Sequence, residues 1–357
     1  MKITAVKSKK CDLGLLRPYS IAYKTVDSVS VSLVEIKLEN GIYGLGSSNP
    51  SPYVVNESVE ETVVTLVADD FEWLIGKDIT TFQQLLYEVN TRYPKQPGVR
   101  AALDIALYDA FTKYLGVPLV TFLGQKMESL YTSITIGIKN VKETMEEAEE
   151  YIGRGFKILK VKLGKSIEED IERLVKIREK YGASIITRID ANQGYDFEQI
   201  SEFYERTKAL DLELIEQPIA ASDIAPMRKL PKHINALVAA DESLVSPEDA
   251  FKLASPPAAC GIFNIKLMKC GGVSKALEIA TIAQNSNIAL MWGCNDESII
   301  SITAALHAAF ACPNTKYIDL DGSLDLAKDV VKGGFILENG KMSVNGKPGL
   351  GVSYITE

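Results

Sequence analysis

Eight short apolar runs recur between residues 134 and 321, and amphipathic helix-like stretches separate them in units of roughly 25 residues. The runs read ITIGI from 134, KILKVKL from 157, IITRID from 185, LELIEQ from 212, ALVAAD from 236, GIFNIK from 261, IALMWGC from 288 and KYIDLD from 316. Strands that alternate with helices form a parallel sheet, and eight of them close into a barrel. The repeat therefore predicts a (β/α) barrel.

The segments before and after this repeat have different patterns. Residues 1–125 combine an alternating strand pattern, SVSVSLVEIKLENGIYGLG, with helical segments between 58 and 115, whereas residues 322–357 contain the closely spaced Gly, Asn and Pro of turns and short strands. We expect an α/β protein: a modified TIM (β/α)7β barrel over residues 126–321 with an α+β capping domain over residues 1–125. The C-terminal tail, residues 322–357, is expected to return to the capping domain.

Composition limits the partners of the chain. The formal net charge of -8, with no Lys/Arg cluster, argues against nucleic acid. The N-terminus lacks the apolar core of a signal peptide, and the longest uncharged stretch, residues 298–315, predicts a buried helix more readily than a membrane span. The five cysteines include no CxxC pair, which suits reduced thiols. We expect a cytoplasmic protein with no nucleic-acid or membrane partner, and a homo-oligomer remains open.

Charged residues stand where most of the predicted strands end. In a barrel of this kind the active site lies at the carboxyl ends of the strands. The second run ends with Lys160 and Lys162, the third with Asp190, the fourth with Glu216, the fifth with Asp241, the sixth with Lys266, and the eighth with Asp319 and Asp321. These side chains are therefore the candidates for the chemistry.

Asp190, Glu216 and Asp241 follow three consecutive strands, so we expect three carboxylates to face one point. Ligation by oxygen alone selects a hard cation, and Mg²⁺ keeps open positions for substrate oxygens. The alternative is that each acid only caps the helix that follows it.

Lys160 and Lys162 are two apart on a strand and so share a face, unless they form a solvated surface pair. Burial or a nearby metal can lower the pKa of a lysine and make it a usable base. Because the second and sixth strands are four apart in a ring of eight, Lys162 and Lys266 should approach the barrel axis from opposite sides. One lysine would remove a proton and the other would return one to the opposite face. Metal and Lys160 would stabilise the enediolate between these steps.

Asp319 and Asp321 also share a face. They suit the ammonium group of an amino acid or peptide, although a helix cap is the competing explanation.

These residues, in this order, resemble the enolase superfamily and, within it, the muconate lactonizing enzyme subgroup. Lys160-Val161-Lys162 matches the KxK motif, Asp190, Glu216 and Asp241 match the metal ligands, and Lys266 matches the second base. Asp319-Leu320-Asp321 resembles the DxD motif of the dipeptide epimerases, similar to L-Ala-D/L-Glu epimerase. The resemblance implies that Thr135 and the segment 295–298 line the pocket of a dipeptide substrate.

Two departures concern specificity. Lys24 stands where Ala-Glu epimerases typically have arginine, and a lysine cannot make the planar two-point contact with a carboxylate. Asp296 adds an anion where some relatives have Met. We therefore expect an epimerase of Ala-containing dipeptides with a small or apolar partner.

Several alternatives remain open. L-Ala-D/L-Glu epimerase itself, N-acylamino acid racemase, o-succinylbenzoate synthase and muconate cycloisomerase would use the same lysines and metal ligands. A noncatalytic metal-binding barrel is the non-enzyme alternative. A histidine-based racemase is disfavoured because no His ends the seventh run. Gly44-Leu45-Gly46 is a weak nucleotide-binding signal, which we interpret as a turn.

Overall fold

A computed structural model describes residues 1–20 and 25–355 of the chain. It contains an eight-stranded sheet of order β14-β13-β12-β11-β10-β9-β8-β7, and every pairing within it is parallel. The strands are β7 (Ile134–Ile136), β8 (Ile158–Lys162), β9 (Ile186–Asp190), β10 (Ile215–Glu216), β11 (Val238–Ala240), β12 (Ile262–Ile265), β13 (Ala289–Gly293) and β14 (Thr315–Asp319). Each predicted apolar run contains one of them, so the barrel prediction is confirmed.

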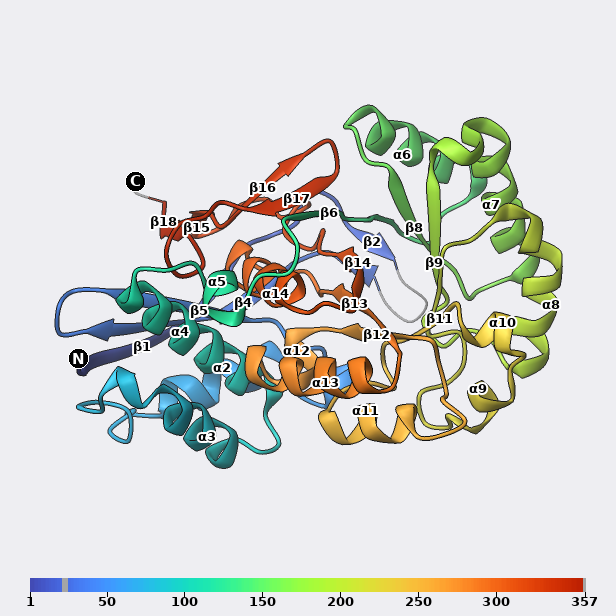
Figure 1. Cartoon of the computed structure of the whole chain (residues 1–357). Coiled ribbons are helices and arrows are strands. Elements are labelled where there is room, and N and C mark those ends of the chain that lie inside the picture. The colour runs from blue at the N-terminus through green and yellow to red at the C-terminus, as the bar shows by residue number, and fades with distance from the viewer. Residues whose placement is uncertain (21–24, 356–357) are drawn as a thin grey trace.

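A single bridge between Thr132 and Ile318 joins the two ends of this sheet, so the barrel closes without a full ladder there. Helices follow the first seven strands and surround much of the barrel (Figure 1). They are α6 (Val141–Gly153), α7 (Ile167–Tyr181), α8 (Phe197–Thr207), α9 (Ala225–Lys229), α10 (Lys232–Asn235), α11 (Pro247–Ala254), α12 (Leu267–Cys270), α13 (Val273–Asn285) and α14 (Ile299–Ala311), with 3-10 turns η2 (Gly182–Ser184) and η3 (Lys208–Leu210). Among the described residues no helix follows β14, which gives the predicted (β/α)7β pattern.

The barrel helices begin at their own capping residues. Side chains of Asn140, Ser166, Asp196, Ser246 and Ser298 accept hydrogen bonds at the starts of α6, α7, α8, α11 and α14. The acids at the strand ends are absent from this set. Helix capping therefore does not explain Asp190, Glu216 or Asp241, and no described helix follows Asp319 and Asp321.

The capping domain packs a helix tightly on a small sheet. Strands β1 (Ile3–Asp12), β4 (Ser30–Leu38) and β5 (Tyr43–Ser48) form an antiparallel sheet, accompanied by α1 (Pro52–Val55), α2 (Val59–Ala68), η1 (Ile79–Thr81), α3 (Phe82–Arg92), α4 (Pro97–Leu115) and α5 (Leu119–Leu123). Gly44 and Gly46 lie within β5, so their interpretation as a turn was wrong. A Cβ on either glycine would collide with backbone of α4, so both allow this helix to approach the sheet closely.

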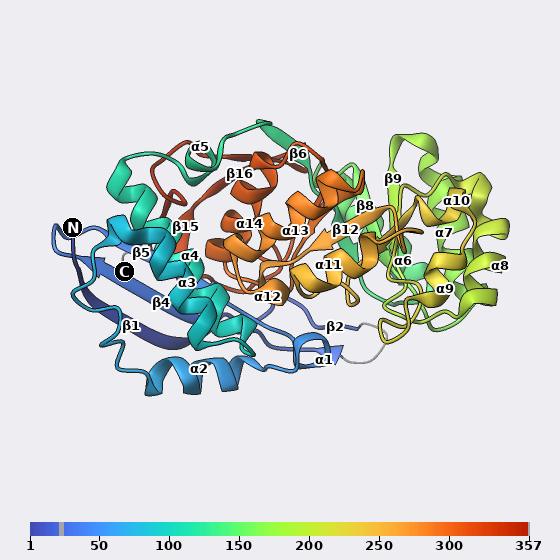
Figure 2. The same ribbon diagram turned by 60° about the horizontal axis from the view of Figure 1, so that its bottom comes forward.

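The tail contacts both the capping domain and the barrel. Strand β15 (Val331–Gly333) pairs with β18 (Val352–Tyr354), and the hairpin of β16 (Phe335–Glu338) and β17 (Lys341–Val344) adds to β6 (Ser129–Tyr131). Tyr354 donates a 2.7 Å hydrogen bond to Glu35 of the capping sheet. Both termini lie at the capping end, away from α7 and α8 (Figure 2). The domain boundaries at 125 and 321 stay predictions.

The segment before the first barrel unit includes a short pairing of β2 (Tyr19–Ser20) with β3 (Thr25–Val26). The predicted buried helix at 298–315 is α14, in which every residue after Ile299 is buried. Within the part of the chain that the structure describes, no helix is long and apolar enough to cross a membrane.

Candidate active site

A cavity of about 290 Å³ lies at the carboxyl ends of the barrel strands, where the capping domain meets the barrel. Its barrel side is lined by Thr135, Lys160, Lys162, Asp241, Lys266, Asp319 and Asp321, together with neighbouring loop residues. The capping domain contributes residues 49–52 and the start of α2. The cavity therefore contains most of the residues that the sequence singled out.

Two lysines on β8 form one wall. The Lys162 ammonium is 2.5 Å from Asp190 Oδ2, and Lys160 lies 3.3 Å from the same oxygen. Lys160 also contacts Glu216 at 2.8 Å and Asp319 at 2.7 Å. Burial alone would lower the pKa of Lys160, but the three carboxylates outweigh it and hold the pKa well above its ordinary value. Lys160 is thus a fixed positive charge rather than a base, and the surface-pair alternative is excluded for it by its 3% side-chain exposure.

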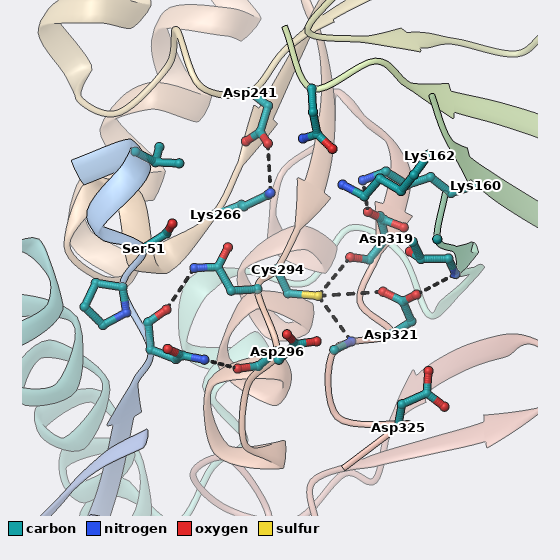
Figure 3. Close-up of a pocket in the computed structure, with 18 of the residues that line it drawn as sticks. Ser51, Lys160, Lys162, Asp241, Lys266, Cys294, Asp296, Asp319, Asp321 and Asp325 are labelled. Atoms are coloured by element: carbon teal, nitrogen blue, oxygen red, sulfur yellow. Dashed lines mark hydrogen bonds and ion pairs between the residues drawn. The ribbon is translucent and has the colours of Figure 1, made fainter. Parts of the chain in front are cut away.

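The opposite wall also contains two lysines that share one carboxylate. Lys266 follows β12 and contacts Asp241 Oδ2 at 2.8 Å. A second buried lysine, Lys269, binds the other carboxylate oxygen of Asp241 and donates to two backbone carbonyls, those of Asp241 and Asn264. Figure 3 shows the ammonium end of Lys266 facing those of Lys160 and Lys162 across the pocket. The two candidate bases, Lys162 and Lys266, therefore lie on opposite sides of the pocket, as expected.

The pKa of Lys266 is not lowered in this arrangement. Burial would lower it, but the charges of Asp241 and Glu216 outweigh burial and raise the pKa. The same pairing holds the pKa of Asp241 well below its usual range, although burial opposes this. For Lys266 to accept a proton, the negative charge of Asp241 must be engaged elsewhere.

Glu216 carries the least compensated charge of the three acids. Burial, followed by the charge of Asp190, raises its pKa to about 8. Asn264 donates a 2.8 Å hydrogen bond to Oε1, whereas the buried Oε2 accepts no hydrogen bond from a described residue and lies 2.8 Å from the Lys160 ammonium. A buried carboxylate oxygen in this state suits a cation.

Within residues 1–20 and 25–355, no three His, Cys, Asp or Glu side chains are arranged as a ready metal site. Lysines contact Asp190, Glu216 and Asp241 in this arrangement. The donor set itself fits Mg²⁺, since it consists of buried carboxylates alone and leaves Glu216 Oε2 without a hydrogen bond. Binding would require at least Lys162 and Lys266 to give up their carboxylate contacts. The assignment of these three ligands stays a prediction.

Asp319 ends β14 and Asp321 lies two residues beyond it, and the two carboxylates have different partners. Asp319 is held by Lys160 and by the Ser133 hydroxyl at 2.6 Å, and Ser133 in turn accepts from Arg188 at 3.1 Å. Asp321 accepts a 2.8 Å hydrogen bond from the backbone N–H of Thr135. Burial and the charge of Asp319 raise the pKa of Asp321 to about 7. Asp321 is therefore the member of the pair that makes no ion pair with a described residue.

Of the remaining predicted residues, Asp296 and Thr135 line the cavity, and the third lies outside the residues that the structure describes. Asp296 lines the cavity. Its loop is tied to the capping domain because the Asn49 side chain donates to the backbone carbonyl of Asp296, and the Asn295 side chain donates to the backbone carbonyl of Asn49. Thr135 also lines the cavity, and its described contact with Asp321 uses its backbone. Lys24 lies outside the described residues.

The sequence did not single out four further residues: Lys269, Asn192, Glu242 and Cys294. Lys269 comes one helical turn after Lys266, a spacing that could have placed both on one face. Asn192 comes two residues after Asp190, Glu242 directly follows Asp241, and Cys294 directly follows β13. The thiol of Cys294 contacts Asp319, Asp321 and Gly322 (Figure 3). Burial raises the pKa of this thiol, so it is a poor nucleophile.

Two family models match the chain. The mandelate racemase/muconate lactonizing enzyme N-terminal domain matches residues 5–124, and the enolase C-terminal domain-like family matches residues 143–357. Together these matches cover most of the capping domain, the barrel and the tail.

Individual relatives match over the whole length. The L-Lys-D/L-Arg epimerase of Desulforapulum autotrophicum is 50% identical over 99% of this chain and 100% of its own. The L-Ala-D/L-Glu epimerase of Bacillus subtilis is 32% identical over 99% of this chain and 97% of its own. The dipeptide epimerase of Methylococcus capsulatus, solved with Mg and the dipeptide L-Arg-D-Lys, is 49% identical, covers 99% of this chain and 100% of its own, and has a TM-score of 0.98.

Proposed function

The chain belongs to the mandelate racemase/muconate lactonizing enzyme family of the enolase superfamily, and we propose that it is a Mg²⁺-dependent epimerase of dipeptides with basic side chains. The reaction is a 1,1-proton transfer at the α-carbon next to the C-terminal carboxylate. The muconate lactonizing enzyme subgroup and the isomerase class follow from the same relatives.

This proposal rests on the positions of Lys162 and Lys266 on opposite sides of the cavity. Lys162 projects from β8 and Lys266 follows β12, so a flat carbanion-like carbon between them is exposed to a different lysine on each face. One lysine removes the α-proton from its face, and the other delivers a proton from the opposite face. The configuration is inverted, which is epimerisation when the second centre of the dipeptide is untouched.

The negative charge that develops on the substrate carboxylate must be stabilised. Mg²⁺ supplies this when it is bound by Asp190, Glu216 and Asp241. Lys160 adds a buried positive charge beside the same carboxylates and is held there by Asp319, so it needs little reorganisation during the reaction.

Asp321 favours a substrate with a free amino terminus. Its carboxylate lies in the cavity, and the described residues give it one backbone donor and one weak thiol contact rather than an ion pair. An ammonium group would supply the missing positive charge. An N-acylated or purely anionic substrate offers none, which disfavours the acylamino acid racemase and succinylbenzoate synthase alternatives.

The charges of the residues that line the cavity change our prediction for the side chains of the dipeptide substrate. Among the described residues that line the cavity, eight are acidic and four are basic. The acids outside the predicted metal and ammonium sites include Glu60 and Glu147, which pair with Lys10 and Lys139. They also include Asp296 and Asp325, and this acidic lining favours cationic side chains. This replaces our expectation of an Ala-containing dipeptide with a small or apolar partner. The relatives of 49–50% identity are also named for, or solved with, Lys and Arg dipeptides.

Exchange of the α-proton in D₂O tests the proposal. The enzyme is incubated with Mg²⁺ and three matched sets of dipeptides, built from Lys/Arg, Ala/Glu and Ala/Leu, and separately with N-succinyl-Lys. Deuterium incorporation is followed by NMR. We expect Lys/Arg dipeptides to exchange fastest and N-succinyl-Lys to exchange least. The proposal is contradicted if no dipeptide exchanges, or if the N-succinyl compound exchanges faster than every dipeptide.

A further inference from the structure

Two buried oxygens beside the predicted metal ligands accept no hydrogen bond. Asn192 and Glu242 both line the cavity, with 7% and 8% of their surface exposed. Asn192 Nδ2 donates to Glu242 Oε1 at 3.1 Å, which joins the two side chains. Asn192 Oδ1 and Glu242 Oε2 accept no hydrogen bond from any described residue.

The pair is placed beside the three carboxylates. Asn192 comes two residues after Asp190, and its backbone N–H donates a 2.9 Å hydrogen bond to Asp190 Oδ1. Glu242 comes directly after Asp241. The hydrogen bond between Asn192 and Glu242 therefore joins the ends of β9 and β11 across β10, the strand that ends at Glu216.

Leaving two acceptors buried and unpaired is costly, of the order of 1–3 kcal/mol for each group. The Asn192–Glu242 hydrogen bond satisfies one polar atom of each side chain, so a structural role for this bond does not account for the two unpaired oxygens. Their free state suggests a donor that arrives with a ligand. Mg²⁺ loses its hydration shell reluctantly and usually keeps several waters, and each water carries two donors.

We propose that Asn192 Oδ1 and Glu242 Oε2 accept hydrogen bonds from water molecules that Mg²⁺ retains, so that the pair positions the hydrated ion over the three carboxylates. This inference rests on the proposed Mg²⁺ site and assigns a positioning role to two residues outside the ligand set. Groups in such outer positions typically change metal affinity by about 10–100-fold.

The backbone offers a matched pair of variants. Asn192 has φ of 43° and its neighbour Gln193 has φ of 67°, so glycine can replace either one without straining the turn. N192G removes the unpaired oxygen without changing charge. Q193G removes a neighbouring amide whose oxygen already accepts from Ala221 N at 2.9 Å. For the carboxylate, E242Q is matched by D325N, which removes one negative charge from the same cavity.

Calorimetric titration of Mg²⁺ into the metal-free full-length enzyme, without substrate, measures the effect. N192G should bind Mg²⁺ about 10–100-fold more weakly than the wild type, and Q193G should stay within about twofold. E242Q should lose clearly more affinity than D325N. The proposal is overturned if N192G binds like Q193G or, should N192G fail to fold, if E242Q binds like D325N. The affinity is measured without dipeptides, so this outcome is independent of the exchange test of the proposed function.

Discussion

The two opposite walls of the cavity each contain a pair of lysines that share one carboxylate, but the further partners of these lysines differ. In each wall a candidate base shares its carboxylate with a second buried lysine: Lys162 and Lys160 meet at Asp190, whereas Lys266 and Lys269 meet at Asp241. Lys160 is held only by carboxylates, which can change partners when a cation arrives. Lys269 is also held by two backbone carbonyls, which cannot. The carboxylates around Lys160 can therefore exchange a lysine contact for a cation when one binds, whereas Lys269 keeps its contacts with the backbone.

The largest effects are expected at the bases themselves. K162A and K266A should each reduce the kcat of epimerisation by about 10²–10⁴-fold, because each face of the α-carbon then lacks its proton donor or acceptor. Polarimetry or chiral chromatography of a Lys/Arg dipeptide measures the rate. K165A is a control on the loop after β8, and it should retain wild-type activity. If either base variant turns over at the wild-type rate, the two walls do not act as a pair.

Substitutions of the two further buried lysines, Lys160 and Lys269, should have different effects on catalysis and on stability. K160M should lower kcat by about 10²–10³-fold, since it removes a preorganised charge beside the developing enediolate. Its loss of stability should be partly reversed by Mg²⁺, which supplies positive charge to Asp190 and Glu216. Thermal unfolding with and without Mg²⁺, together with kcat, measures both effects.

K269M should destabilise the fold by about 1–3 kcal/mol, because it removes the ammonium that binds one oxygen of Asp241 and the backbone carbonyls of Asp241 and Asn264, while Lys266 still pairs with Asp241. Mg²⁺ cannot replace the hydrogen bonds to the backbone of Asp241 and Asn264, so the loss should persist in its presence. Denaturant unfolding compared with K160M provides the measurement. Equal rescue of both variants by Mg²⁺ would remove the distinction between the two walls.

The pH dependence of dipeptide binding should follow the ionisation of the Asp321 carboxyl. Its pKa is raised to about 7 by burial and Asp319, so the carboxyl is largely protonated below that pH in the empty site. An ammonium group requires the ionised form, so the Kd of a dipeptide should rise about tenfold for each pH unit below 7. D321N should bind weakly and lose this dependence. Calorimetry between pH 5.5 and 8, values chosen to span roughly the titration range, measures it.

The smallest effect is expected at the rim. D296N should raise the KM for Lys/Arg dipeptides by roughly two- to fivefold, because a partly exposed ion pair contributes at most about 1 kcal/mol. The KM for an Ala/Leu dipeptide should stay unchanged. A change of equal size for both substrates would assign Asp296 to the packing of its loop rather than to charge recognition.

The sequence predicted the barrel because each strand is a distinct apolar run, and strand ends locate candidate site residues. It also placed Lys162 and Lys266 on opposed strands, since strand order fixes direction within a closed ring. It did not predict the partners of the side chains. Asp319 and Asp321 look equivalent in the sequence, but Lys160 occupies one and leaves the other open. The Asn192–Glu242 pair depends on loops from different strands meeting, which local spacing does not encode, whereas the position of Lys269 one helical turn after Lys266 could have indicated it.

The stereochemistry of α-proton exchange in the two base variants tests the central claim most directly. Each variant is incubated with Mg²⁺ and either epimer of a Lys/Arg dipeptide in D₂O, and deuterium at the α-carbon is followed by NMR. If Lys162 and Lys266 serve opposite faces, K266A should exchange only one epimer and K162A only the other, without inversion. Exchange of both epimers by either variant, or of the same epimer by both, would contradict the account.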